Sequence, residues 1–369
     1  MRGWWNSEYH GLCRSLFAQA VMCLALVLLP GLVEAACTVE ESPPGQVGPL
    51  MRHLGPDCSQ AEREARAVQA GAVLKAMAAG QAIDLVGVVL EGDVLFDDLP
   101  VRQAQMPKGL TPDQQAALAA IDDGERRLVP GGLILRDSLV KGLIRHSSPK
   151  GTVQFDGPVD FQGTRFVRGV DLSRSVFQGP VTLTKAVFER EAYFVQGQFF
   201  QPLTCVETRF GPHTRFHRTV FHGTVDCQGG LFDGMAELLE VVFEQATSFD
   251  RARFGLGTGF SGSQFKKRVS FSDAIFSRET FFAFAVFNER VQFAGAQFLH
   301  TADFSNAEFR QGEDLAKARF DQPPAISGIK GTTFTGQPKS GQSSTVQFLI
   351  TAGFLLAAAL LVAYAYKLK

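Results

Sequence analysis

The pattern from which the fold follows is clearest in residues 302–311, which have the sequence Ala-Asp-Phe-Ser-Asn-Ala-Glu-Phe-Arg-Gln. In each half of this segment a large apolar residue, Phe304 or Phe309, follows a small one, Ala302 or Ala307, by two positions. Residues two apart lie on the same face of an extended chain, so both members of a pair point to the same side. The segment therefore predicts two short strands that each bury a Phe and an Ala, with a turn between them.

The same pattern runs without a break from Phe155 to Phe320, in alternating steps of six and five residues. A helix does not bring apolar residues with this spacing onto one stripe, and a flat sheet does not turn so often. Four short sides per coil predict an all-β quadrilateral solenoid with 22 residues per coil, stacked by strand pairing between coils. Every step is centred on Phe except at six positions, namely Leu172, Leu183, Cys205, Cys227, Leu238 and Leu315.

These repeats resemble the pentapeptide-repeat family, whose unit is A-(D/N)-L-x-x or its Phe variant; residues 302–306 and 307–311 match it closely. The resemblance covers about 155–320 and implies a right-handed quadrilateral β-solenoid. It also implies a protein without catalytic activity, although some members imitate DNA to bind topoisomerases. This chain departs from the family because every second unit has six residues, so we expect an extra residue in two of the four corners of each coil.

The two ends of the chain predict export and a membrane anchor. Residues 1–35 resemble a signal peptide, with an apolar run from Leu16 to Leu32 and small or apolar residues at Val33 and Ala35. An uncleaved anchor is the alternative, because the run is long for a signal. Residues 346–366 carry no charge and predict one transmembrane helix, followed by a cytoplasmic tail, 367–369, that contains two lysines. We therefore expect a single-pass membrane protein with a flexible stalk, 327–345, and with its solenoid, 155–326, on the extracytoplasmic (periplasmic) side.

The region before the repeats predicts a cap and irregular first coils. Residues 59–80 are rich in Ala with helical spacing and begin at Ser59, so the segment 36–82 is expected to contain a capping helix over the exposed end of the solenoid. Residues 83–154 are expected to form irregular first coils interrupted by a helix, 111–128. Thr111 followed by Pro112 is a favourable start for that helix.

The cysteines form two pairs outside the predicted signal peptide. Cys37 and Cys58 lie in an exported segment and are expected to form a disulfide. Cys205 and Cys227 are one coil apart at inward positions, so they stack on neighbouring coils. Their spacing suits either a disulfide or two buried thiols that fill the core.

Two outer walls carry the candidate interaction residues. On one wall the residue before the centre is Arg in alternate coils, and Arg165, Arg209 and Arg253 form what we call the arginine ladder. The opposite wall is apolar for an exposed face. A contact surface for a partner or a second copy is one interpretation, and the preference of Val for strands is the other. We call its members the valine stripe: Val176, Val220, Val242 and Val286.

Composition excludes several function classes. The formal net charge is −1, from 36 basic and 37 acidic residues, which argues against nucleic acid as a partner. We expect no cofactor, metal or catalytic residue, because carboxylates are scattered and His217 and His222 lie on consecutive walls and diverge. The sequence therefore predicts a non-catalytic, membrane-tethered binding or scaffold module with an unknown partner. The alternatives are a self-associating envelope protein and, less favoured, an enzyme acting on an envelope substrate at the outer walls.

Overall fold

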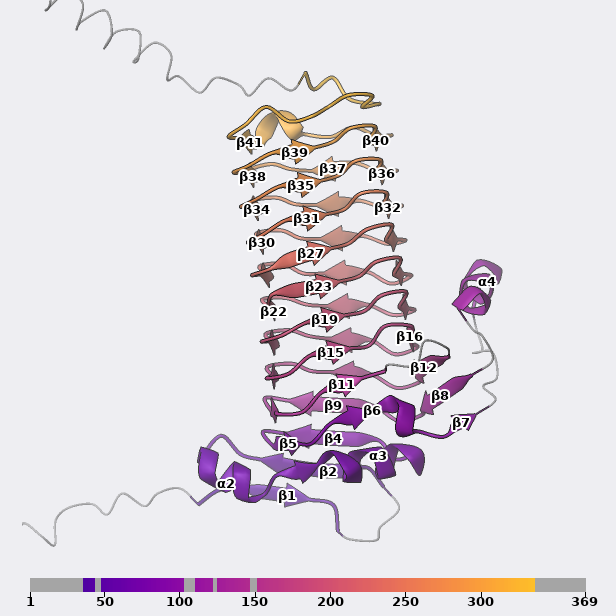
Figure 1. The fold of residues 1–369 in the computed structure, drawn as a ribbon, viewed down its shortest axis with the longest axis vertical. Helices are drawn as coiled ribbons and strands as arrows, with labels where there is room; N and C mark the ends of the chain where they lie inside the picture. The colour runs from indigo at the N-terminus through magenta and orange to yellow at the C-terminus, as the bar shows by residue number, and fades with distance from the viewer. Residues whose placement is uncertain (1–35, 44–47, 103–109, 122–124, 147–150, 336–369) are drawn as a thin grey trace, which may run out of the picture.

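The computed structural model describes residues 36–43, 48–102, 110–121, 125–146 and 151–335. In these residues the chain winds into one four-walled β-solenoid, whose coils stack along a single axis (Figure 1). Each wall is a sheet of short strands that pair in parallel from coil to coil, apart from one antiparallel pair at the end of wall A and one at the end of wall D. The predicted all-β solenoid is confirmed, and we name its walls A to D in the order in which the chain visits them.

Walls A and B are the two larger sheets. Wall A contains β1 (Val39–Glu41), β2 (Leu50–Leu54), β4 (Ile83–Val86), β9 (Leu133–Arg136), β13 (Val159–Asp160), β17 (Val181–Thr182), β21 (Leu203–Thr204), β25 (Val225–Asp226), β29 (Thr247–Ser248), β33 (Val269–Ser270) and β37 (Val291–Gln292). Wall B contains β3 (Val68–Gln69), β5 (Val89–Glu91), β10 (Leu139–Val140), β14 (Arg165–Phe166), β18 (Val187–Phe188), β22 (Arg209–Phe210), β26 (Leu231–Phe232), β30 (Arg253–Phe254), β34 (Ile275–Phe276), β38 (Gln297–Phe298) and β41 (Arg319–Phe320).

Walls C and D complete the square, and in Figure 1 wall C faces the viewer while wall D forms the right-hand edge. Wall C contains β6 (Val94–Leu95), β11 (Ile144–Arg145), β15 (Val170–Asp171), β19 (Ala192–Tyr193), β23 (His213–Arg215), β27 (Met235–Glu237), β31 (Thr258–Gly259), β35 (Thr280–Phe281) and β39 (Ala302–Asp303). Wall D contains β7 (Val101–Arg102), β8 (Arg126–Val129), β12 (Thr152–Phe155), β16 (Ser175–Phe177), β20 (Gln198–Phe199), β24 (Val220–Phe221), β28 (Val242–Phe243), β32 (Gln264–Phe265), β36 (Val286–Phe287) and β40 (Glu308–Phe309).

Stacked phenylalanines fill the axis of the regular coils. The rings of Phe243, Phe265, Phe287 and Phe309 follow one another along wall D with centroids 4.7, 5.0 and 4.9 Å apart. This spacing is set by the backbone, because neighbouring strands of a sheet lie ~4.8 Å apart. Every predicted centre from Phe155 to Phe320 is buried. Phe thus occurs at the centres of all four walls, since each inward position faces the same narrow axis.

The corners explain why steps of five and six residues alternate. In the tight corners, from wall A to wall B and from wall C to wall D, the residue two after the centre often has a positive φ, as in Lys185 (58°) and Asp273 (56°). In the wide corners the size of the side chain is limited instead by close contact with the backbone of the neighbouring coil. A Cβ on Gly223 would lie 2.5 Å from the carbonyl carbon of Gln201, and one on Gly234 would lie 1.9 Å from the carbonyl oxygen of Pro212. The extra residue therefore belongs to the two wide corners.

The first coils keep the wall ladders but not the coil length. Leu90 of wall B pairs with Val140, which is 50 residues later, and Val140 pairs with Phe166, which is 26 residues later. The first extra segment follows β6 and includes the edge strand β7 before it ends at β8, and the second falls between β11 and β12, so both lie where the chain passes from wall C to the parallel strands of wall D. The first segment carries helix α4 (Pro112–Ile121), which projects beyond wall D in Figure 1. The solenoid thus begins at β2, inside the segment that the sequence assigned to the cap.

The helix in the insert is shorter than the predicted range of 111–128. Thr111 begins it as expected, since its hydroxyl accepts a hydrogen bond from the Gln114 amide and its own amide donates to the Gln114 side chain. Helix α4 ends at Ile121, and β8 begins at Arg126 and pairs with β12. Residues 126–128, which were predicted to be helical, are extended because their backbone groups pair with β12 of wall D.

The N-terminal end is closed by strand pairing, two helices and a disulfide. Strand β1 pairs antiparallel with the edge strand β2, and Cys37 is joined to Cys58. The single predicted capping helix is instead two helices, α2 (Gln60–Ala65), which Ser59 caps, and α3 (Ala70–Ala78). They are separated because Val68 pairs with Leu90 in wall B.

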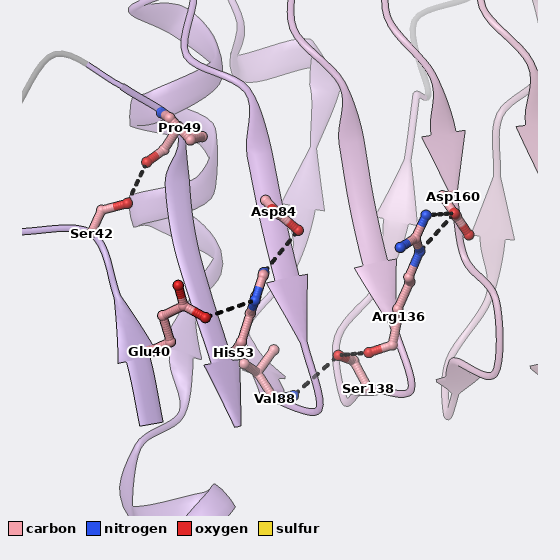
Figure 2. Close-up of polar contacts among 9 residues, drawn as sticks. All are labelled: Glu40, Ser42, Pro49, His53, Asp84, Val88, Arg136, Ser138 and Asp160. Carbon is pink, nitrogen blue, oxygen red and sulfur yellow. Dashed lines mark hydrogen bonds and ion pairs between the residues drawn. The ribbon is translucent and has the colours of Figure 1, made fainter. Parts of the chain in front are cut away.

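Charged side chains form ion pairs between neighbouring strands on the outer face of wall A at this end. Figure 2 shows His53 between Glu40 and Asp84, with the Asp84 oxygen 3.0 Å from the ring. Arg136 reaches Asp160 on the next coil, at 2.6 Å. Hydrogen bonds and attraction to Asp160 raise the pKa of Arg136. Alternating acids and bases thus hold the first coils together where their lengths are irregular.

The C-terminal end is covered by residues that the sequence assigned to a flexible stalk. The backbone of Lys330 pairs with that of Glu308 of wall D in an isolated parallel β-bridge. The ring centroid of Phe334 lies 5.6 Å from that of Phe320. These residues belong to the solenoid because they cover the last Phe of the stack. Short helices η1 (Phe96–Asp98) and η2 (Leu315–Lys317) complete the described elements. The predicted signal peptide and the predicted membrane segment, 346–366, lie outside the described residues, among which no helix has the length and apolarity to span a membrane.

Candidate interaction walls

The valine stripe on wall D is partly covered by the chain's own insert. Val176 is fully buried beneath Leu118 of α4, and the two residues pack with Phe200 from the next coil. The sequence placed Val176 on an open face, and the structure instead closes that part of the face. The cover ends after Phe200, because Val220, Val242 and Val286 remain half-exposed on the following coils. Wall D therefore has an occupied part near α4 and a vacant part beyond it.

A line of polar side chains runs beside the valine stripe. His222 stacks on Phe200, with ring centroids 4.6 Å apart, and lies 2.8 Å from a carboxylate oxygen of Glu244 and 3.0 Å from the amide oxygen of Gln198. Lys266 donates to Glu244 at 2.8 Å. Burial raises the pKa of Glu244, but the hydrogen bonds from Lys266 and His222 outweigh burial, and the pKa lies below its ordinary value. Each group belongs to a successive coil, so the line fixes the edge of the vacant part.

The corner from which both extra segments leave is also held by buried polar contacts. His146 is buried and lies 3.0 Å from a carboxylate oxygen of Asp97, while its other ring nitrogen lies 3.3 Å from the carbonyl of Gly151. Arg126 donates to the side chain of Gln154 at 3.0 Å. These bonds link the short helix Phe96–Asp98 to the end of β11, and β8 to β12, across the openings of the two segments. They fix the base of the arm that carries α4.

The arginine ladder on wall B is largely neutralised by its own coils. Arg165 forms an ion pair with Glu189, and Arg209 forms one with Asp233 at 2.5 Å. Each acid follows the centre of the next coil on the same wall. For Arg253 that position is Ser277. The ladder therefore presents paired charges to solvent, which does not favour it as an anion site.

The two inward cysteines are joined, and the histidines do not gather. Cys205 and Cys227 form a disulfide between adjacent coils, with Cα atoms 4.4 Å apart. His213 contacts Glu237 at 3.3 Å, whereas His217 lies 4.0 Å from Glu240. In the part of the chain that the structure describes, no group of three or more His, Cys, Asp or Glu residues is placed to hold a metal ion.

Wall C carries an apolar surface that sequence reasoning missed. Four of its residues are exposed, with exposed fractions of 44% for Met235, 46% for Leu256, 43% for Phe281 and 63% for Phe284. Together with Leu239 they form what we call the wall-C patch, on and beside β27, β31 and β35. The signal was present in the sequence, because Phe281 and Phe284 fall outside the register of centres.

One comparison with known proteins, a match to a family model, falls on the repeat register. Residues 231–275 match the family model for pentapeptide repeats (9 copies). Among solved structures, the chain is similar to HetL from the cyanobacterium Nostoc, a pentapeptide repeat protein involved in heterocyst differentiation regulation; the identity is 12%, the TM-score is 0.25, and the alignment covers 58% of this chain and 91% of HetL. No curated protein matches this sequence. The matched residues lie within the unbroken Phe register, and this part of the chain consists of pentapeptide repeats.

Proposed function

We propose that this protein is a non-catalytic, membrane-tethered scaffold outside the cytoplasm, and that wall D binds an amphipathic helix of a protein partner. The observation that carries the proposal is the packing of Leu118 on Val176 and Phe200. The chain itself uses the outer face of wall D as a docking surface for a helix. The valine stripe continues past this helix, so the same kind of surface is repeated on the vacant coils.

The geometry of the stripe suits a helical ligand. Val220 and Val242 are direct neighbours in the wall ladder, and neighbouring strands lie ~4.8 Å apart. A helix advances about 5.4 Å per turn, so one lying along the solenoid axis would meet successive coils with successive turns. Gln264 and Val286 continue the row, and Lys266 with Glu244 would border it. An apolar row beside a charged edge is complementary to an amphipathic helix.

Two features support the location outside the cytoplasm. The Cys37–Cys58 disulfide is typical of an oxidising compartment. The uncharged residues 346–366 followed by lysines are typical of a membrane anchor with a cytoplasmic end. The family's usual lack of catalysis supports the absence of an enzymatic role. These features support the proposal together with the export pattern of the first 35 residues.

The test is site-specific photo-crosslinking in the intact envelope. A crosslinker placed at Val242 or at Val286 should give a discrete adduct with another protein. The adduct at Val286 should be lost in the double variant Val220→Lys, Val242→Lys. The matched control is Ile275, a half-exposed strand residue on wall B, which should give no adduct. An adduct with a second copy of this chain would favour a self-associating envelope protein instead. Equal adducts at Val242 and Ile275 would rule out wall D as the specific face.

A further inference from the structure

The wall-C patch is an apolar surface with no cover among the described residues. Four of the seven exposed large hydrophobic residues that the structure describes, Met235, Leu256, Phe281 and Phe284, lie on three successive coils of this wall or its corners. Isolated exposed apolar residues are ordinary, but a cluster of this kind marks a contact with another apolar phase. The patch also lies on a different wall from the valine stripe, so it is a second surface.

Phe284 shows that the patch does not serve the fold. It occupies a tight corner with a φ of 58°, where other coils have Arg218, Glu240, Gly262 or Asn306. Bulky residues adopt this conformation at a cost. Its amide bonds to the carbonyl of Ser305, which any residue at this position can do. The ring is 63% exposed, so its contribution lies outside the solenoid.

Two apolar members of the patch lie on either side of Gly259 in wall C. Gly259 and Phe281 are direct neighbours in the wall C ladder. A Cβ on Gly259 would lie 2.7 Å from a methyl carbon of Leu239, so Leu239 occupies the space above the glycine. Leu239 and Phe281 therefore both lie beside Gly259, whose ladder neighbour on the preceding coil is Glu237.

Several of the charged side chains around the patch lie in ion pairs. Arg215 and Arg218 each contact a glutamate at 2.7 Å, Glu237 and Glu240 respectively. On the other side of the wall, His300 lies 3.3 Å from Glu279. The surface therefore attracts neither polyanions nor polycations, and a neutral apolar phase suits it better.

We propose that the wall-C patch contacts the surface of the lipid bilayer, so that the solenoid lies on its side against the membrane that anchors it. This inference rests on the proposed anchor at 346–366. Two strand spacings, ~10 Å, separate Phe281 from Ala325 on the last coil, because Phe281 pairs with Asp303 and Asp303 with Ala325. The segment 336–345 spans at most about 33 Å. The tether is therefore long enough to let wall C reach the bilayer, and the insertion of Phe281 and Phe284 would fix the orientation.

The test uses single tryptophan reporters in the full chain. Trp4 and Trp5 are first replaced by Phe, since they are the two tryptophans of the sequence. The reporter is Phe284→Trp, and the control is Asp273→Trp, which has nearly the same φ, 56°, at the opposite tight corner. Each protein is reconstituted in phosphatidylcholine vesicles with ordinary or brominated acyl chains, because bromine quenches tryptophan on contact.

We expect the emission of the Phe284→Trp protein to fall about twofold in brominated vesicles, as for a ring buried at the acyl boundary. The Asp273→Trp protein should show no change, since its corner faces away from wall C. Proteins that float with vesicles but show equal emission at both positions would overturn the wall-C contact and leave the anchor intact. A protein that fails to float would overturn the anchor as well. Protection of Phe284→Trp from aqueous quenchers without bromine quenching, together with crosslinked dimers, would assign the patch to a second copy instead.

Discussion

The regular coils, from Phe155 to Phe320, and the coils before them share the same strand pairing in the walls. They differ in the length of the chain at the corners. In the regular part, Val159, Val181, Leu203 and Val225 pair in turn along wall A at intervals of 22 residues. In the first coils the same ladder continues through Leu50, Ile83 and Leu133, although the intervals vary. The wall is thus preserved while the coil length is not.

The difference teaches that strand pairing, rather than coil length, defines this solenoid. A loop costs little more when it is lengthened, because closure entropy grows slowly with length. An insert is therefore tolerated at a corner if the flanking strands still pair. The long insert with α4 and the much shorter one after β11 both lie where the chain passes from wall C to the parallel strands of wall D, and the ladders of walls A and B continue past them. The insert with α4 then gains a function of its own by covering wall D.

The largest expected loss of stability comes from a substitution on the axis of the regular coils. Phe260 lies within a cluster of rings, with centroids 5.0 Å from Phe282 and 5.4 Å from Phe271. Phe260→Ala should lower the free energy of unfolding by about 3–5 kcal/mol, because it removes a ring and leaves a cavity. Denaturant titration of the full chain measures the change. The matched change in the first coils, Leu135→Ala, should cost less because Leu135 has no stacked ring neighbours, and an equal loss would contradict the special role of the Phe stack.

A second change tests the two kinds of corner. Gly234→Ala places a Cβ against the carbonyl of Pro212, so the neighbouring coil must move, and we expect a loss of roughly 1–3 kcal/mol. Lys185→Gly relieves a positive φ in a tight corner and should raise stability by up to about 1 kcal/mol. Thermal unfolding of both variants gives the comparison. If both substitutions shift stability in the same direction, the distinction between tight and wide corners is wrong.

A third change sharpens the comparison between insert and solenoid. Leu118→Ala should release α4 from Val176 and Phe200 while the coils stay folded. Amide hydrogen exchange should then show lost protection over 112–121, and the free energy of global unfolding should change by less than about 1 kcal/mol, because the insert opens locally. Ala119→Ser, at an exposed position of the same helix, is the control. Cooperative loss of protection in the regular coils would show that the arm is part of the core.

The smallest effect concerns the polar line on wall D. The pKa of Glu244 is lowered below its ordinary value of 4.5, so its carboxylate stabilises the fold above that value, and this contribution is lost as pH falls through the lowered pKa. Glu244→Gln should therefore cost below about 1 kcal/mol near neutral pH, since the group is partly exposed. The difference from the parent should shrink as the pH falls below 4.5. A difference that grows on acidification would contradict the assigned direction.

Much of the fold was open to prediction, and the functional surfaces less so. The Phe register located each wall, because the inward position of every short strand repeats at fixed spacing and is occupied by an apolar residue, most often Phe. The arginine ladder was placed on the correct wall, but its neutralisation depends on acids such as Glu189 that lie two dozen positions away. The burial of Val176 was missed for the same reason, since strands β8 to β15 separate it in the chain from Leu118. The wall-C patch was missed because Phe281 and Phe284 lie within two positions of the centre Phe282 and were not separated from the many Phe residues of the register.

The sequence by itself determined the period, the four-walled architecture and the residues that face the axis, since these follow from local geometry repeated at fixed spacing. Only the tertiary structure decided which corner receives the inserts, where α4 rests, and which outer side chains share a surface. Those outcomes depend on contacts between residues that are far apart in the chain. Val176 and Phe281 have the same apolar chemistry, and the position of a distant segment decides that one is buried and the other exposed.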